Sequence, residues 1–131
     1  MSWPQGSLYS KKDQFHPTDA AFVDGNTIYI TDGYGKAFVM PAKREPLRYD
    51  GIYIGGKEMS QTPHGITYVK ERKALLVSAR PEGKIKGLKA DRAEWLETLA
   101  LPAGSTVCDV DVWGDYALAP CLKGPDKTPG P

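Results

Sequence analysis

The chain has 131 residues, of which 40% are hydrophobic and 25% charged, and its formal net charge is +1. This composition is typical of a globular protein, and 17 basic residues scattered among 16 acidic ones argue against a nucleic-acid partner. No apolar run approaches the roughly 18 residues of a membrane span, and the first residues lack the basic start and apolar middle of a signal peptide. The sequence leaves the cellular compartment open.

Short apolar runs and turn residues alternate along most of the chain. Residues 1–15 are polar and interrupted by Pro4 and Gly6, so they are expected to form an irregular lead-in. After them the spacing of roughly ten residues between apolar runs indicates an antiparallel meander and excludes crossover helices. Strands are predicted at 19–23, 27–31, 36–40, 51–55, 66–69, 74–79, 84–88, 95–101, 107–113 and 116–121.

The segment 91–100 fits two interpretations. Its first four residues match a capping box, after which 95–100 would form about two turns of helix. Trp95, Glu97 and Leu99 also fit the period of two of a β-strand. We favour the strand, because the repeat described next requires one at this place.

Three similar segments open with Pro17-Thr18-Asp19, Pro63-His64-Gly65 and Val107-Cys108-Asp109, about 46 and 44 residues apart. Each leads into an apolar strand, and a turn and a second apolar strand follow. This period is typical of the four-stranded blades of a β-propeller. The predicted fold class is therefore all-β, a partial β-propeller of about two and a half antiparallel blades.

The repeat predicts that the chain forms a single partial domain, 1–131. Its parts are the lead-in 1–15, a blade at 16–55, a blade at 56–102, the inner hairpin of a third blade at 103–123 and a connector at 124–131. The innermost strands are expected at Ala20–Val23, Ile66–Val69 and Val110–Val112. Residues expected to pack between blades are Phe22, Tyr29, Leu76 and Trp113.

The number of blades has a consequence for partners. Propellers close with roughly four to eight blades, and each blade packs its faces only against its neighbours. We therefore expect either that the chain is a fragment whose remaining blades complete the ring, or that a second copy covers the open faces.

Two cysteines, Cys108 and Cys121, flank the last predicted hairpin. If Gly114-Asp115 is a two-residue turn, counting outward sets the cysteines opposite each other, at a separation that a disulfide can span. Pro120 weakens this count because it removes a ladder donor and can bulge the strand. Two free thiols, buried or lining the channel, are the alternative.

Thr18, His64 and Cys108 occupy equivalent places at the starts of the three predicted inner strands. Inner strands of a propeller line its central channel, so these residues are expected to converge. Because imidazole and thiolate bind zinc, His64 is a candidate metal ligand and Cys108 a weaker one. The alternative is that His64 only holds the strand entry by hydrogen bonds. His16, one residue out of register, is expected to be structural or on the surface.

Four motifs follow one another in order: Pro17-Thr18-Asp19, Ile30-Thr31-Asp32-Gly33-Tyr34-Gly35, Pro63-His64-Gly65-Ile66 and Ala79-Arg80-Pro81-Glu82-Gly83-Lys84-Ile85. Through them the chain resembles the NHL-repeat six-bladed propellers. It is most similar to the branch of the peptidyl-α-hydroxyglycine α-amidating lyases, also called peptidylamidoglycolate lyases. The resemblance covers residues 16 to about 121.

This resemblance implies a carbon–nitrogen lyase acting on a small-molecule or peptide ligand. It also implies a zinc ion held by three histidines from alternate blades, a nearby structural calcium, and the secreted or periplasmic location frequent in the family. His64 matches the first of those histidines, and the other two would lie beyond Pro131. Arg80 matches the family's arginine, and Tyr34 and Arg80 are the candidate catalytic residues.

The chain also departs from the lyase pattern. Lyases carry Asn-Ser-Arg after the Asp-Gly-Tyr motif, whereas this chain has Lys36-Ala37-Phe38, so Phe38 replaces the arginine that holds the substrate carboxylate. Lys36 lies at a different pleat position and is no substitute. Ala79 stands where the family has aspartate. The alternative function is therefore that of a non-catalytic propeller, which serves as a platform for a binding partner.

Overall fold

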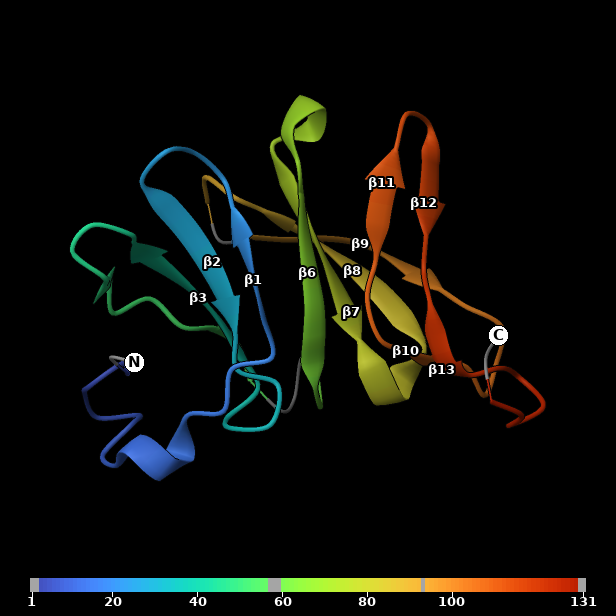
Figure 1. Cartoon of the computed structure of the whole chain (residues 1–131), viewed down its shortest axis with the longest axis horizontal. Coiled ribbons are helices and arrows are strands. Elements are labelled where there is room, and N and C mark those ends of the chain that lie inside the picture. Colours follow the sequence, from blue (N-terminus) through green and yellow to red (C-terminus); the bar gives the residue numbers. More distant parts are fainter. Residues whose placement is uncertain (1–2, 57–59, 93, 130–131) are drawn as a thin grey trace.

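The computed structural model describes residues 3–56, 60–92 and 94–129 (Figure 1). Antiparallel β-sheets account for its regular structure, together with short 3₁₀ turns at Lys12–Gln14 (η1), Lys70–Arg72 (η2) and Arg80–Glu82 (η3). The described residues contain no α-helix, and none of their helical segments is long and apolar enough to cross a membrane. The predicted all-β class is confirmed.

The first sheet has the strand order β1-β2-β3-β4, and β5 pairs with the other half of β3. Its strands are β1 (Asp19–Phe22), β2 (Thr27–Thr31), β3 (Phe38–Lys43), β4 (Arg48–Tyr49) and β5 (Ile54–Gly55). The strand predicted at 36–40 is thus wrong by two residues at its start, because Ala37 has a φ of 62° and still belongs to the turn. The single strand predicted at 51–55 is reduced to β5, since Gly51 turns the chain with a φ of 73°.

The second sheet has the order β6-β7-β8-β9. Its strands are β6 (Pro63–Val69), β7 (Ala74–Ala79), β8 (Lys84–Lys89) and β9 (Glu94–Ala100). Because β9 pairs with β8 along its length, with Leu88 opposite Trp95, the strand interpretation of 91–100 is confirmed and the helix is wrong.

The third repeat is a hairpin in two parts. Its strands are β10 (Thr106–Val107), β11 (Asp111–Trp113), β12 (Tyr116–Leu118) and β13 (Cys121–Lys123). Trp113 faces Tyr116 across the two-residue turn, as the sequence predicts. Farther out, residues 108–110 stand opposite only 119–120, so the strands predicted at 107–113 and 116–121 are each broken in two.

This bulge corrects the expected pairing of the cysteines. Val107, not Cys108, is the partner of Cys121, and the Cys108 amide donates to the carbonyl of Pro120 at 2.8 Å. The extra residue on one strand shifts the register by one, which turns facing side chains to opposite faces of the hairpin. Both cysteines are half-buried free thiols.

Three strands from successive repeats lie side by side, with β6 between β1 and β11 (Figure 1). These strands, β1, β6 and β11, contain most of the predicted inner segments, and the other strands of each sheet extend away from them. Such open, adjacent antiparallel sheets are consistent with partial propeller blades.

Apolar side chains fill the contacts between neighbouring sheets. Tyr29 is buried between the first and second sheets, and Leu76 packs against Ile85, Val107 and Val110 between the second sheet and the third repeat. Both were expected there. Phe22 and Trp113 were also expected there, but they are 61% and 82% exposed, because strand alternation points them to the face opposite the buried Ala21 and half-buried Val112.

The lead-in has little regular structure, as expected, but it is packed rather than loose. Tyr9 and Phe15 are buried against the face of the first sheet that lies opposite the second sheet. The two rings meet edge to face, with centroids 6.0 Å apart. The lead-in therefore covers one end of the stack of sheets.

Tyr9, Tyr29 and Tyr49 are expected to ionise at a higher pH in the folded chain than in the unfolded chain. Loss of water disfavours the phenolate, so burial raises the pKa of Tyr9 and Tyr29 and raises the pKa of Tyr49 to about 12. The folded chain thus holds these protons more tightly than the unfolded chain, whose tyrosines titrate near 10.0. These tyrosines make their full contribution to folding stability below the unfolded-state pKa of 10.0. That contribution is lost as the pH rises through their folded-state pKa values.

Ultraviolet absorbance of tyrosinate during an alkaline titration checks this expectation. Ionisation of Tyr9, Tyr29 and Tyr49 should appear above the pH at which unfolded tyrosine ionises, and it should be accompanied by loss of the folded circular dichroism signal. Ionisation of these three phenols at the unfolded-state pH, with the folded signal intact, would contradict the buried positions of Tyr9 and Tyr29 and the half-buried position of Tyr49.

Candidate functional site

A hydroxyl group on the second strand of each complete sheet ties that sheet to the next one. Thr31 Oγ1 accepts the Asp19 amide at 3.1 Å and donates to the His64 carbonyl at 3.1 Å. Ser78 Oγ accepts the Gly65 amide at 2.6 Å and donates to the Cys108 carbonyl at 3.0 Å. The same joint therefore recurs in two successive repeats, and it brings the starts of the inner strands together at one end of the sheets.

Thr18, the residue equivalent to His64 in the first repeat, adds to the same joint. Its hydroxyl donates to the carbonyl of Pro63 at 3.0 Å. The Asp19 carboxylate accepts the Ile66 amide at 2.9 Å. The expected convergence of the repeat positions is thus built from side chains of one sheet that bond the main chain of the next.

His64 extends this pattern with its ring. Its Nδ1 lies 2.9 Å from the Cys108 carbonyl oxygen, which only accepts hydrogen bonds, so Nδ1 carries the proton. In the neutral ring the lone pair is then on Nε2, the nitrogen through which such a histidine can bind a metal ion. His64 thus holds the strand entry by a hydrogen bond, and Nε2 is the ring nitrogen that this bond leaves free.

Tyr34 and Arg80 lie beside His64. The Tyr34 ring stands edge-on to the His64 ring, with centroids 5.6 Å apart and planes at 82°. Arg80 Nη1 donates to the Tyr34 phenol oxygen, and the guanidinium carbon is 6.0 Å from the centre of the Tyr34 ring. Tyr34 is 59% exposed, so the ring and hydroxyl are accessible to a ligand.

The residues Tyr34, His64, Arg80 and Cys108 are named the mouth cluster. They come from the turn after β2, the start of β6, η3 and the segment after β10. The four candidate site residues from the sequence therefore lie together. Cys108 contacts His64 through its backbone carbonyl and not through its thiol. The described part of the chain contains no group of three or more histidine, cysteine, aspartate or glutamate side chains able to hold a metal.

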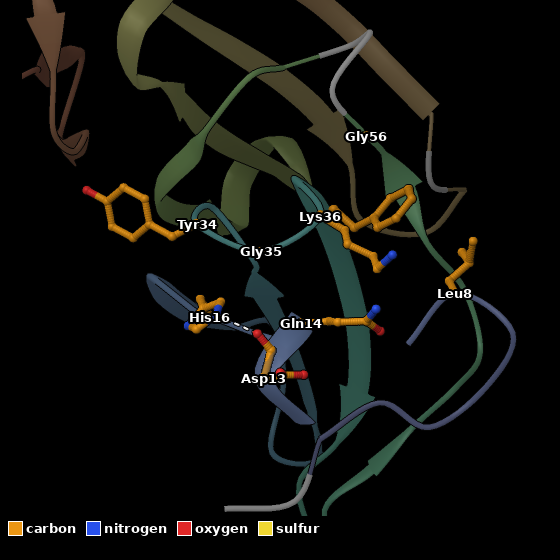
Figure 2. Close-up of a pocket in the computed structure, with 9 residues that line it drawn as sticks. Leu8, Asp13, Gln14, His16, Tyr34, Gly35, Lys36 and Gly56 are labelled. Carbon is orange, nitrogen blue, oxygen red and sulfur yellow. Dashed lines mark hydrogen bonds between the residues drawn. The ribbon is translucent and has the colours of Figure 1, made fainter. Parts of the chain in front are cut away.

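An open cavity of about 540 Å³ lies next to Tyr34 (Figure 2). The lead-in forms one wall of this cavity and the turn before β3 forms the other. Residues that line it are Leu8, Asp13, Gln14, His16, Tyr34, Gly35, Lys36, Phe38 and Gly56. His16 lies at its exposed rim, where its Nε2 contacts the Asp13 carbonyl at 2.7 Å, in agreement with the expected surface position.

Phe38, which stands where the resemblance leads one to expect a carboxylate-binding arginine, packs among aromatic rings. Its ring centroid is 5.6 Å from that of Tyr53 and 6.4 Å from that of Tyr9. Lys36 is the cation nearest in sequence, and its Nζ lies 5.9 Å from the centre of the Tyr9 ring. The Phe38 side chain therefore has an apolar packing role.

Asp32 is a site residue that the sequence analysis missed. Its fully buried carboxylate accepts the His16 amide at 2.6 Å, the Lys36 amide at 2.7 Å and the Tyr9 hydroxyl at 2.5 Å. These bonds close the turn that carries Tyr34. The sequence feature that reflects this buried carboxylate is Gly35, because a Cβ at position 35 would lie 2.2 Å from an Asp32 carboxylate oxygen.

No protein-family model matches the chain, and no curated protein matches it. The resemblance to NHL propellers and amidating lyases therefore stays a prediction that depends on the quoted motifs.

Proposed function

We propose that the chain forms part of an NHL-type β-propeller whose mouth cluster is a metal-assisted site of the amidating-lyase kind. The observation that carries the proposal is the His64 ring, whose Nδ1 is bonded to the Cys108 carbonyl at 2.9 Å. A backbone carbonyl at one ring nitrogen is the usual way in which proteins orient a metal-binding histidine. The side-by-side position of β1, β6 and β11 supports a shared channel.

His64 is the one zinc donor that the proposal places in this chain. His64 would supply one ligand through Nε2, and other blades of the propeller would supply the rest. When bound, zinc polarises an oxygen of the ligand and lowers the cost of removing its proton. With only one such ligand placed here, we expect this chain to bind zinc weakly, since most binding energy comes from three or four protein donors.

Tyr34 and Arg80 would handle the ligand. Arg80 donates to the phenol oxygen and so fixes the Tyr34 ring beside His64, which leaves the hydroxyl proton of Tyr34 directed away from Arg80. In a lyase of this kind the carbinol O–H loses its proton as the carbonyl forms, and the amide nitrogen gains a proton as the carbon–nitrogen bond breaks. Tyr34 is the accessible acid–base group next to His64, and we assign both transfers to it: the phenol gives its own proton to the leaving nitrogen and receives the carbinol proton in return.

Phe38 favours a second function. Because its ring belongs to the cluster with Tyr9 and Tyr53, the structure offers no guanidinium there to hold a substrate carboxylate. A propeller that binds a ligand or protein partner at the mouth cluster without turnover needs none. Turnover of a peptidyl-α-hydroxyglycine by the zinc-loaded complete propeller would favour the lyase, and metal binding without turnover by that complete propeller would favour the platform.

Replacing His64 with alanine is expected to remove the weak zinc binding of the chain without unfolding it. The His64 ring is half-buried, and its loss leaves the Cys108 carbonyl with its bond from Ser78. Calorimetric titration with zinc measures the effect, and His16→Ala is the matched control because it removes the other histidine. Equal zinc affinity of wild type and His64→Ala would reduce His64 to a strand-entry residue.

A further inference from the structure

Three aspartates of the chain are followed directly by glycine, at Asp24-Gly25, Asp32-Gly33 and Asp50-Gly51. An aspartyl-glycine pair can rearrange without an enzyme, because glycine has no side chain to hinder attack by its amide nitrogen on the aspartate carboxyl group. The reaction needs a carboxyl group that is not held by other groups and an amide that is not hydrogen-bonded. The three pairs differ on both points.

Hydrogen bonds hold the carboxylates of the first two pairs. Asp24 Oδ1 accepts the Asn26 amide at 2.7 Å and the Thr27 amide at 2.6 Å, and these bonds lower the pKa of the Asp24 carboxyl group. Asp32 is fully buried and accepts three hydrogen bonds. A carboxylate that is stabilised in its charged form is a poor target for a nucleophile. Neither pair is therefore expected to react in the folded chain.

The third pair, Asp50-Gly51, has neither restraint. Both residues are exposed in the turn between β4 and β5. Within the described residues, the Asp50 carboxylate has no hydrogen-bond or ion-pair partner, and the Gly51 amide donates to no acceptor. Gly51 has a φ of 73°, and a Cβ at this position would meet no atom within 4 Å. The structure thus leaves both reacting groups free at this pair, with open space around Gly51.

We propose that Asp50-Gly51 is the site at which the folded chain forms isoaspartate. The Gly51 amide nitrogen bonds to Cγ of Asp50, and one carboxyl oxygen leaves as water, which takes the amide proton and the proton of the acid. A water molecule then opens the cyclic imide. Attack at Cγ restores aspartate, whereas attack at the main-chain carbonyl carbon of Asp50 leaves the chain connected through Cβ and Cγ. The main chain of this isoaspartate is one atom longer, and its mass is unchanged.

The extra atom falls between two tyrosines that pack against the lead-in. Tyr49 meets Phe15 edge to face, with ring centroids 5.8 Å apart, and Tyr53 stacks on Tyr9, also at 5.8 Å. A longer main chain between Tyr49 and Tyr53 changes the spacing of these two contacts. Isoaspartate at Asp50 is therefore expected to loosen the lead-in. The reaction involves no residue of the mouth cluster, so it is independent of the proposed metal site.

Ageing of the whole chain at physiological temperature, followed by peptide mapping, tests the proposal. Isoaspartyl methyltransferase labels the modified peptides, and an endoproteinase that cleaves before aspartate leaves isoaspartate uncut. We expect at least about fivefold more isoaspartate at Asp50 than at Asp24 or Asp32, because their carboxylates must first lose two or more hydrogen bonds. In urea these bonds are absent, so the three pairs should react at comparable rates.

Asp50→Glu keeps the charge but removes the site, because the longer side chain forms its cyclic imide far more slowly. Asp24→Glu is the matched control, and circular dichroism establishes that both variants are folded. Aged Asp50→Glu should carry almost no isoaspartate, whereas aged Asp24→Glu should match wild type. Trypsin cleavage at Lys11 and Lys12 in the lead-in should rise on ageing in wild type and not in Asp50→Glu.

Two results would overturn the proposal. One is as much isoaspartate at Asp24 as at Asp50 in the folded chain. The other is a folded chain without isoaspartate at Asp50 after an incubation in which the urea-unfolded chain forms it. Trypsin cleavage of the lead-in that is the same with aspartate and with isoaspartate at Asp50 would contradict the expected loosening.

Discussion

Replacing Asp32 with asparagine is expected to lower the free energy of unfolding by about 3–5 kcal/mol. The carboxylate is fully buried and accepts three hydrogen bonds, from two backbone amides and from Tyr9. An asparagine amide in the same place directs its own N–H groups at one of these donors. At least one buried donor then loses its acceptor, and the turn that carries Tyr34 is no longer closed.

Urea unfolding followed by circular dichroism measures this loss. Tyr9→Phe is the graded control, because it removes one hydroxyl and leaves the carboxylate with its two backbone amides, for an expected loss of about 1–2 kcal/mol. If Asp32→Asn is as stable as wild type, or more stable than Tyr9→Phe, the carboxylate does not organise this turn.

Replacing Gly65 with alanine is expected to be the second most damaging change, at about 2–3 kcal/mol. A Cβ at this position would lie 2.7 Å from the Asp109 Cα and 2.2 Å from its Oδ1. A side chain can rotate away, but the Asp109 Cα moves only with the main chain after β10. That shift separates the Cys108 carbonyl from His64, so the change acts on both stability and the mouth cluster.

The control for this change is Gly25→Ala, since a Cβ at Gly25 meets no atom within 4 Å. Thermal unfolding of both variants provides the comparison, and zinc titration shows whether the metal site is lost with the stability. Wild-type stability of Gly65→Ala would mean that the second sheet and the third repeat are not held this close together.

The repeat made the inner strands and the meeting of His64 with Cys108 predictable from sequence. Equivalent positions in repeated units occupy equivalent places, so Thr18, His64 and Cys108 were expected at one end, where the structure has them. The turn at Gly114-Asp115 was predictable for a local reason, because a two-residue hairpin loop depends only on its own residues.

Other features depend on contacts that a local pattern does not contain. Tyr9 is buried because it meets Asp32, 23 residues away, and nothing in the lead-in itself indicates that partner. The predicted pairing of Cys108 with Cys121 was wrong, because one extra residue at 108–110 shifts the strand register by one. Trp113 was expected to pack between blades, yet strand alternation leaves it 82% exposed.

The protonation of the His64 ring tests the central claim, that its Nε2 is prepared to bind a metal, most directly. Long-range proton–nitrogen NMR resolves the ring nitrogens, and the chain has two histidines, so His16→Ala assigns the signals. We expect the neutral His64 ring to carry its proton on Nδ1, and added zinc to shift Nε2 while Nδ1 stays protonated. A neutral ring protonated on Nε2, or zinc that shifts His16 and leaves His64 unchanged, would contradict the claim.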